Sequence, residues 1–266
     1  MSNWRNASGR PLSAISWLEA HHRAKLAERT AFVRSVLKTN PKRIVDLGCG
    51  PGLWLELFNS EAAPSCEFLG IDVDTAAIEL ARTRAATWSR PTAFMQLDIE
   101  AASHEIPEAD VFLAFNLFPY LSDPTQFLNH LHRQTRLGGV VAVRQYDGSL
   151  LRLGPMPHRT RNSVDLSLQA AILGSEQFRH YDMDRVFVAL ASSSFAARRI
   201  DFELFRRVSP YPPEFLEYLQ NSIDWMMDYV SDFARPALQE WYEIHAQSGF
   251  SAPSYFMEVD LVAWLS

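Results

Sequence analysis

A glycine-rich stretch, Asp46-Leu47-Gly48-Cys49-Gly50-Pro51-Gly52, follows the apolar run Arg43-Ile44-Val45. It is followed by the run Leu53-Trp54-Leu55-Glu56-Leu57-Phe58. The pattern predicts a strand, a glycine turn and a helix. Three glycines in five positions allow the backbone to bend sharply and to approach a ligand closely. The helix behind them points its free N–H groups and its positive dipole end at that ligand. The stretch therefore predicts a site for a nucleotide-like cofactor that carries a negative group.

Later apolar runs continue the pattern of short buried strands. Residues 68–74 form a second strand that ends at Asp72, whose carboxylate can accept both hydroxyls of a ribose. Residues 94–99 form a third strand that ends at Asp98. The remaining runs are residues 109–116, which lead into a loop over 117–124, and residues 137–143, which give a glycine turn and a fifth strand.

The Asp-x-Gly-x-Gly-x-Gly turn, with these runs in order behind it, resembles the first motif of the S-adenosylmethionine-dependent methyltransferases with a Rossmann-like core. The resemblance covers roughly residues 40–146 and implies S-adenosylmethionine as the cofactor. It also implies an α/β fold with an open, mostly parallel, seven-stranded sheet. Helices would cover both faces, and the last strand would be antiparallel.

The resemblance also implies roles for individual residues. Asp98 would accept a proton from the adenine amino group, and Ile99 would pack against the ring. Asn116 would lie on the sulfur side of the cofactor, next to the loop beside the reactive methyl. The implied cofactor-binding residues are Asp46, Gly48, Cys49, Gly50, Gly52, Asp72, Val73, Asp98, Ile99 and Asn116.

Length and composition predict one elaborated enzyme domain over residues 1–266. Hydrophobic residues make up 47% of the chain, and the net charge of −6 leaves no basic stripe for nucleic acid. Cys49 and Cys66 suit a reducing compartment and have no metal-ligand spacing, so no metal is expected. Neither a signal-like core nor a membrane-length apolar run is present. We therefore expect a cytoplasmic protein, without membrane or nucleic-acid partners, that acts on a small molecule.

The N-terminal part, residues 1–39, is expected to form a helical cap. Residues 14–38 predict one long helix in which His22 shares a face with Leu18 and Leu26. A core histidine with a backbone partner is the favoured interpretation of this position. The alternative is that His21 or His22 acts as a base beside the methyl acceptor.

The half that follows the cofactor core of residues 40–146 spans residues 147–266 and is expected to face the substrate. Asn162 or Ser163 could cap a helix that runs to about His180, and a further helix is predicted over 184–195. The alternation in residues 198–205 predicts a sixth strand, and residues 254–264 predict the final, reversed strand.

Residues 211–247 form an aromatic helical insertion between these two strands, with Gly249 as the predicted stop of its second helix. One apolar stripe at helical spacing faces the core, and its members are Phe215, Leu219, Ile223, Met226, Val230 and Phe233. A second stripe contains Tyr218, Trp225 and Tyr229. This second stripe predicts either a lid on a substrate pocket or the interface of a homo-oligomer. Trp225 and Tyr229 are candidate substrate-binding residues.

Candidate residues for the reaction come mainly from strand ends, where ligands bind in open α/β sheets. Tyr120 and Tyr146 follow strands, and an ordinary packing role is an equally good interpretation of each. Phe118 and Arg144 are candidate substrate contacts. The segment 116–120 is similar to an Asn-Pro-Pro-Tyr motif of amino-methylating enzymes, but it has one extra residue. The candidate catalytic residues are His21, His22, Tyr120 and Tyr146.

The expected activity is S-adenosylmethionine-dependent methyl transfer to a small, cyclic or aromatic metabolite, at oxygen. Methylation of nitrogen or carbon, or of a macromolecule, remains an alternative within the class. From other classes, a nicotinamide-dependent oxidoreductase or a noncatalytic cofactor-binding subunit would also use a glycine turn. The acid at the third strand end and the reversed final strand favour the methyltransferase.

Overall fold

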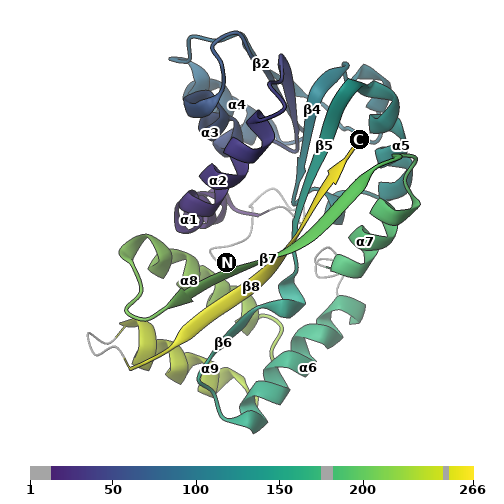
Figure 1. Cartoon of the computed structure of the whole chain (residues 1–266). Helices are drawn as coiled ribbons and strands as arrows, with labels where there is room; N and C mark the ends of the chain where they lie inside the picture. Colours follow the sequence, from purple (N-terminus) through teal and green to yellow (C-terminus); the bar gives the residue numbers. More distant parts are fainter. Residues whose placement is uncertain (1–12, 175–181, 248–251) are drawn as a thin grey trace. The chain divides into compact units, whose positions relative to one another are not determined.

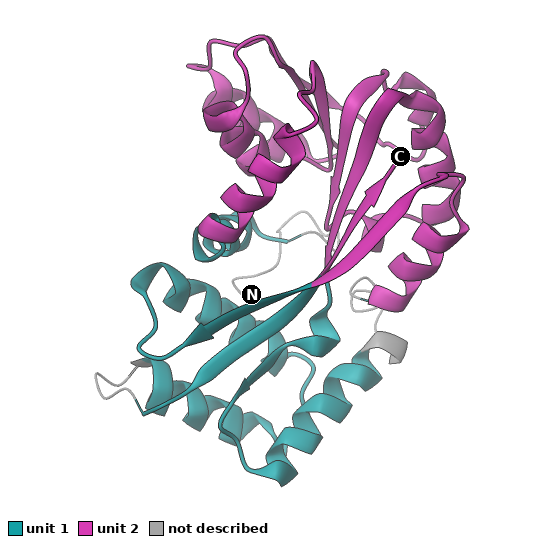
Figure 2. Cartoon of the chain, viewed as in Figure 1, with its two compact units in different colours: residues 1–26, 146–182, 203–260 teal, residues 27–145, 183–202, 261–266 magenta. Residues whose placement is uncertain are grey.

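The computed structural model describes residues 13–174, 182–247 and 252–266, although the side chains of residues 172–174 and 247 are not part of that description. The chain divides into two compact units (Figure 2). Unit 1 draws on Met1–Leu26, Tyr146–Asp182 and Glu203–Asp260, and unit 2 draws on Ala27–Gln145, Met183–Phe202 and Leu261–Ser266.

Strands and helices follow one another along most of the described chain (Figure 1). The strands are β1 (Arg43–Leu47), β2 (Glu67–Asp72), β3 (Thr92–Gln96), β4 (Ala109–Phe115), β5 (Thr135–Tyr146), β6 (Arg152–Gly154), β7 (Arg198–Val208) and β8 (Tyr255–Leu265). The α-helices are α1 (Ile15–Ala24), α2 (Leu26–Leu37), α3 (Leu53–Glu61), α4 (Thr75–Ala85), α5 (Pro124–Gln134), α6 (His158–Gly174), α7 (Met183–Ser192), α8 (Pro213–Met227) and α9 (Arg235–Tyr242). Short turns are η1 (Ser103–Glu105), η2 (Phe118–Tyr120) and η3 (Gly148–Leu150), with a π-helical turn η5 (Glu243–Gln247).

Unit 2 contains a parallel sheet, as the sequence predicts, and the structure gives the strand order β3-β2-β1-β4-β5. Leu47 pairs in register with Ile71 of β2 and Ala114 of β4. Asp72 pairs with Gln96 at the end of β3. The carboxyl ends of these four strands therefore meet at one edge of the sheet, which is where open α/β folds bind their ligands.

The strands of unit 2 are covered on both faces. Figure 1 shows α2, α3 and α4 on one side of the strands and α5 and α7 on the other. Strand residues are buried on both faces of the sheet, among them Ile44 and Val111 on one face and Val45 and Phe112 on the other. One apolar core lies on the α2 and α3 side. It includes Phe32, Ile44, Leu55, Phe58, Phe68, Val111, Leu113 and Val140.

The fifth strand begins earlier than predicted. β5 starts at Thr135, so the predicted glycine turn lies inside the strand, where the pairing with β4 shifts register between Ala109 and Val111. Gly138 has a φ of 78°, and a Cβ on Gly139 would lie 2.7 Å from the carbonyl oxygen of Asp110. Glycine is required at position 139 because a bulge, rather than a free turn, brings two backbones together.

The C-terminal strands confirm the predicted reversal and add one strand. β8 pairs antiparallel with β6, and β7 also pairs with β8. The sheet of the described residues therefore has eight strands rather than seven. β6 was missed because three residues beside prolines resemble a loop in sequence, and only pairing with residues 255–257 makes them a strand.

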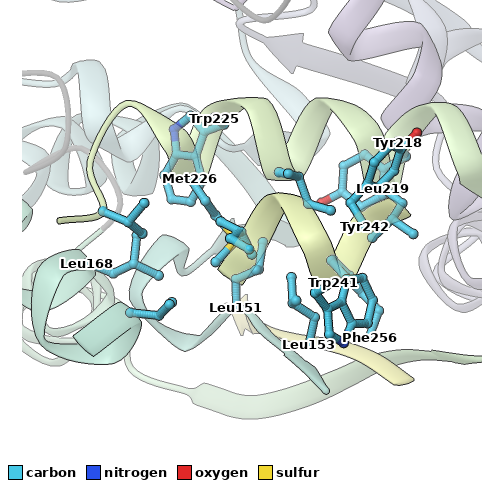
Figure 3. Packing of buried hydrophobic residues seen from close by; sticks show 14 of the residues in the cluster. Leu151, Leu153, Leu168, Tyr218, Leu219, Trp225, Met226, Trp241, Tyr242 and Phe256 are labelled. Carbon is cyan, nitrogen blue, oxygen red and sulfur yellow. The ribbon is translucent and has the colours of Figure 1, made fainter. Parts of the chain in front are cut away.

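Unit 1 has its own aromatic core, to which the insertion contributes α8 and α9. Figure 3 shows Met226 pointing from α8 toward α9, and Trp241 close to Leu153 and Phe256. Tyr218 and Trp225 are buried in this core, and Tyr229 packs against it half-buried. Phe233 differs from the predicted apolar stripe, since its side chain is 52% exposed beneath the Arg159 guanidinium.

The predicted N-terminal helix is interrupted at Lys25. α1 ends at Ala24 and α2 begins at Leu26, with Lys25 at φ −112° and ψ 19°. The helical spacing of apolar residues continues past Lys25, because this spacing carries no information on the direction of a single side chain. The sequence therefore did not predict the break. Lys25 is only 1% exposed, and its ammonium group binds buried carboxylates.

Helices elsewhere in this half begin close to their predicted positions. α6 starts at His158, four residues before the predicted Asn162 cap, and α7 covers most of the predicted 184–195 helix. Three predicted features lie outside the described residues, namely residues 1–12 of the N-terminal cap, the end of the helix near His180, and the Gly249 stop.

Candidate functional site

The glycine turn that follows β1 adopts a left-handed backbone at each of its glycines. The φ angles are 71° at Gly48, 52° at Gly50 and 79° at Gly52. Residues with a Cβ are strained at these positive φ angles, so the backbone conformation by itself explains why glycine occupies the three positions. Cys49 is buried inside the turn, and burial raises the pKa of its thiol well above the usual value, so the residue is an inert part of the turn.

The N–H groups of the turn are all used within the protein. Gly48 and Cys49 both donate to the Ile71 carbonyl oxygen, at 2.7 and 2.9 Å. Gly50 donates to Asp72 Oδ2 at 2.7 Å, and Gly52 donates to the Cys49 carbonyl at 3.0 Å. Pro51 has no N–H. Residues 48–52 therefore offer no free backbone donor to a phosphate, contrary to what the turn alone suggests.

Asp46 lies beneath this turn as a buried acid. Its side chain is 1% exposed, and its Oδ2 has no hydrogen-bond partner among the described residues. Burial, followed by the charge of Asp72, raises the pKa of the Asp46 carboxyl well above its usual range. A buried acceptor of this kind is satisfied by a donor that arrives with a ligand.

Asp72 lies at the end of β2 and stabilises the glycine turn through hydrogen bonds. Its Oδ2 accepts from Gly50, and its Oδ1 accepts from the Asp74 N–H at 2.8 Å, with Val73 between them. Burial raises the pKa of Asp72, although these backbone donors oppose the shift. Each carboxylate oxygen retains a second lone pair, so the group can still accept from two ribose hydroxyls.

Asp98 lies beside the end of β2, because the Leu97 N–H donates to the Asp72 carbonyl at 2.9 Å. Its Oδ1 accepts from the N–H groups of Glu100 and Ala101 at 3.0 and 3.2 Å, which fixes the turn after β3. Ile99 is buried next to it. The exposed Asp98 and the apolar Ile99 are thus placed together at the sheet edge, as an adenine site requires.

The loop after β4 packs onto the glycine turn. A Cβ on Gly48 would lie 3.0 Å from Leu117 Cδ1, so the two loops are in direct contact. Asn116 has a φ of 51°, and its N–H donates to the Arg144 carbonyl at 2.8 Å. In the η2 turn, Phe118 is fully buried and Tyr120 is half-buried.

Arg144 lies at the end of β5, with its guanidinium 5.4 Å from the centre of the Phe32 ring. A second buried arginine, Arg29 of α2, lies 4.7 Å from the Trp54 ring. The Phe32 and Trp54 rings are 6.0 Å apart, so two guanidinium groups lie on one aromatic cluster. Such groups bind carboxylates in two-pronged fashion. Sequence analysis missed Arg29 because a helical arginine resembles a surface residue.

The other candidate residues belong to unit 1. His21 and His22 are both buried on α1, and the His21 ring stacks on Tyr218 at 4.9 Å with an angle of 10° between the rings. Tyr146 is buried at the end of β5. Trp225 is 2% exposed, and its ring lies 5.4 Å from that of Tyr229.

A buried ionic cluster in unit 1 was missed by the sequence analysis. Lys25 pairs with Glu258 and lies 3.4 Å from Asp260, and the Tyr218 hydroxyl donates to Glu258 at 2.6 Å. The Lys25 ammonium also lies 4.7 Å from the Phe205 ring. Burial raises the pKa of Glu258, and the lysine opposes that shift. The signal was available, since alternation places Glu258 and Asp260 on the same strand face as Phe256.

Comparison with known proteins supports the same class. Residues 44–139 match the family model described as "Methyltransferase domain". A malonyl-[acyl-carrier protein] O-methyltransferase of Legionella pneumophila is 27% identical over 188 residues, which is 68% of this chain and 58% of that protein. A trans-aconitate 2-methyltransferase of Rhizobium etli is 31% identical over 137 residues, 50% of this chain and 51% of that protein.

Among solved structures, the plantazolicin methyltransferase BpumL, in complex with a monoazolic desmethylPZN analog and SAH, has a similar fold. The TM-score is 0.50 at 17% identity, over 94% of this chain and 86% of that chain. The chain spans about half the length of the curated relatives that it matches. No helix within the described residues is both long and apolar enough to span a membrane.

The matches confirm the resemblance predicted from the motifs. Residues 44–139 of this chain form a class I, Rossmann-like methyltransferase domain, and the cofactor of that class is S-adenosylmethionine.

Proposed function

We propose that this chain transfers the methyl group of S-adenosylmethionine to an oxygen atom of a small, cyclic or aromatic molecule, and that residues 1–266 make up a single methyltransferase domain. The support comes from the cofactor edge of unit 2, from the aromatic residues of the insertion, and from the names of the relatives.

The main support for S-adenosylmethionine as the cofactor is the charge distribution around the glycine turn. Residues 48–52 offer no free N–H, while Asp46 and Asp72 place two acids beside them. A diphosphate would meet these two carboxylates and would find no N–H donor in residues 48–52, which is unfavourable. A ligand with a sulfonium and an ammonium group would instead meet complementary charge. This favours S-adenosylmethionine over a nicotinamide dinucleotide.

The proposed cofactor roles follow from the placement of each group. Asp46 faces the cationic end, Asp72 accepts from the ribose hydroxyls, and Asp98 accepts from the adenine amino group while Ile99 lies against the ring. The remaining proposed contacts are Gly48, Cys49, Gly50, Gly52, Val73 and Asn116.

The reaction itself is an in-line displacement. The bound cofactor supplies an activated methyl, and as the new bond to the acceptor oxygen forms, the bond to sulfur breaks and its electron pair stays on sulfur. The protein contributes mainly by holding the acceptor in line with that bond. A base is needed only for an acceptor that is protonated at working pH. We propose His21, His22, Tyr120 and Tyr146 as candidates for this role, with Phe118, Arg144, Trp225 and Tyr229 as substrate contacts.

Oxygen as the acceptor atom is supported by the relatives, two groups of which are named as O-methyltransferases, of malonyl-[acyl-carrier protein] and of ubiquinone biosynthesis. Methylation of nitrogen or carbon, and of a macromolecular acceptor, are the outcomes that would replace this proposal. The acceptor is best sought with isotopically labelled S-adenosylmethionine and a panel of phenols, carboxylic acids and amines. Release of label by mild alkali identifies a methyl ester, whereas an ether or a methylamine retains it.

Calorimetric titration with S-adenosylhomocysteine and with NADH tests the cofactor. We expect the first to bind and the second not to, and the reverse would exclude a methyltransferase. Gly50→Val should abolish binding, because a branched side chain would enter the turn at a φ of 52°. Gly138→Val is the matched control, since it places the same residue at a φ of 78° where a Cβ meets nothing within 4 Å.

Trp225→Ala tests the insertion. If the second stripe contacts the substrate, the affinity for the acceptor should fall while S-adenosylhomocysteine binding is unchanged. If it forms an interface, the mass measured by light scattering should decrease. A loss of about 3–5 kcal/mol in unfolding free energy with neither change would assign Trp225 to core packing alone.

A further inference from the structure

The acceptor-side loop, residues 117–123, is held by a single carboxylate from the turn after β3. Glu100 accepts from the Ser122 N–H at 2.8 and 3.0 Å, through both of its oxygens. It also accepts from the Ser122 hydroxyl at 2.8 Å and from the Asp123 N–H at 3.3 Å. Three donors on one carboxylate make a charge-assisted contact that is stronger than an ordinary surface hydrogen bond.

The same loop is held from α7 by an arginine. Arg185 donates to the carbonyl oxygens of Phe118 at 3.0 Å, of Leu121, and of Ser122 at 3.2 Å. A guanidinium presents several N–H groups in a fixed fork, so one side chain can bind three carbonyls of a turn. Two N–H groups of the loop, those of Ser122 and Asp123, thus bind Glu100, and three of its carbonyl groups bind Arg185.

Glu100 also belongs to the adenine-side turn. Its own N–H donates to Asp98 Oδ1 at 3.0 Å, so the position of the Asp98 carboxylate and that of Glu100 are linked through one bond. On the other side, Leu117 packs against Gly48 of the glycine turn. The loop therefore contacts both turns that we assign to the cofactor.

We propose that Glu100 and Arg185 are positioning residues that set the conformation of residues 117–123, and that Glu100 couples cofactor binding at Asp98 to the order of this loop. The coupling part rests on the proposed function, because it places the adenine at Asp98. Arg185 holds the loop whether or not cofactor is present. Glu100 tightens the loop when the Asp98 turn is fixed by the cofactor, which prepares the acceptor side only after the methyl donor has bound.

Amide hydrogen exchange, with S-adenosylhomocysteine as the probe, tests the coupling. In the wild-type protein, the probe should slow exchange at the Ser122 and Asp123 amides. In Glu100→Ala, these amides should exchange about tenfold faster without ligand, since a charge-assisted acceptor is lost. The slowing by the probe should also disappear, although calorimetry still detects binding. Glu105→Ala, which removes an exposed carboxylate from the neighbouring η1 turn, should behave as wild type.

Several results would overturn the coupling. One is probe-induced protection of Ser122 and Asp123 that persists in Glu100→Ala, and another is its absence in a wild-type protein that binds the probe. If the wild-type protein does not bind the probe, the proposed function fails. The exchange rates without ligand then still decide whether Glu100 positions the loop.

Arg185 is tested by the amides within the η2 turn. The Tyr120 N–H donates to Leu117 at 2.9 Å and the Leu121 N–H donates to Phe118 at 3.2 Å, so both report on the turn that Arg185 holds. Arg185→Ala should accelerate their exchange equally with and without the probe. Arg185→Lys should restore little, because an ammonium cannot bind the carbonyls in a fork. Unchanged exchange in Arg185→Ala would remove this residue from the proposal.

Discussion

Each unit of this protein contains a pair of neighbouring acids, and the charges of the two pairs are compensated in different ways. In unit 1, Glu258 and Asp260 share the ammonium group of Lys25, and Glu258 also accepts from Tyr218. In unit 2, Asp46 and Asp72 form no ion pair with any described residue, and Asp72 is held by backbone N–H groups. One pair shares a cation that the chain itself supplies, and the other pair does not.

The difference separates a structural cluster from a binding site. Burying a charge is unfavourable unless a partner compensates it, so an internal cation turns the acids of unit 1 into a fixed part of the fold. The acids of unit 2 lack such a cation in the described residues, and a cationic ligand would supply it. Perturbed acids at a sheet edge are therefore the better indicator of function here.

The largest expected effect is at Lys25. Lys25→Met leaves Glu258 and Asp260 buried without a cation, and we expect the unfolding free energy to fall by about 3–5 kcal/mol. Urea denaturation measures the change, with Lys42→Met as a control at an exposed lysine. A Lys25→Met protein as stable as the control would show that the two pairs of acids do not differ.

An intermediate effect is expected at Asp72. Asp72→Asn keeps the shape but removes the charge that would bind the ribose hydroxyls, so S-adenosylhomocysteine affinity should fall by about 1.5–3 kcal/mol. Asp98→Asn should lose less, because an amide oxygen can still accept from the adenine amino group. Calorimetric titration compares the two variants, and a larger loss in Asp98→Asn would mean that the roles of the strand ends are misassigned.

The smallest expected change in unfolding free energy is at Asp46, where the sign of the change is the informative result. Its pKa is raised in the folded state, so the native protein binds the proton more tightly and its stability falls as pH rises above the usual aspartate range near 4. Asp46→Asn removes this effect. Without ligand, we expect the variant to be more stable than wild type at pH 7, on the order of 1 kcal/mol, and to lose that advantage toward pH 4. Thermal unfolding across this pH range measures the difference.

The same substitution should weaken S-adenosylhomocysteine binding, because a neutral amide would replace the charged carboxylate whose Oδ2 is unpaired. Stabilisation together with loss of binding is the signature of a group kept for function. A loss of stability at pH 7 would instead place Asp46 with the acids of unit 1, as a residue that the fold requires.

Local rules account for the parts of the molecule that were predicted correctly. The first five strands and the acids at their ends follow from short-range patterns that residues 43–146 carry in full. The parallel sheet and its reversed final strand were implied by the family resemblance that those motifs carry. Whether Trp225 and Tyr229 contact substrate stays a prediction. Long-range pairing explains the errors. β6 exists only because β8 lies beside it, and the helix break at Lys25 coincides with carboxylates more than two hundred residues away.

The sequence by itself determined the class of this protein, because a glycine turn and a series of strand-end acids are local signals with a fixed order. It also determined that the insertion is helical and aromatic. The tertiary structure alone decided which charges are compensated. Lys25 and Arg29 both look like surface residues of a helix, yet both are buried. The direction of the turn's N–H groups was likewise decided only by contact with β2, since hydrogen-bond partners depend on what lies opposite in space and not on neighbours along the chain.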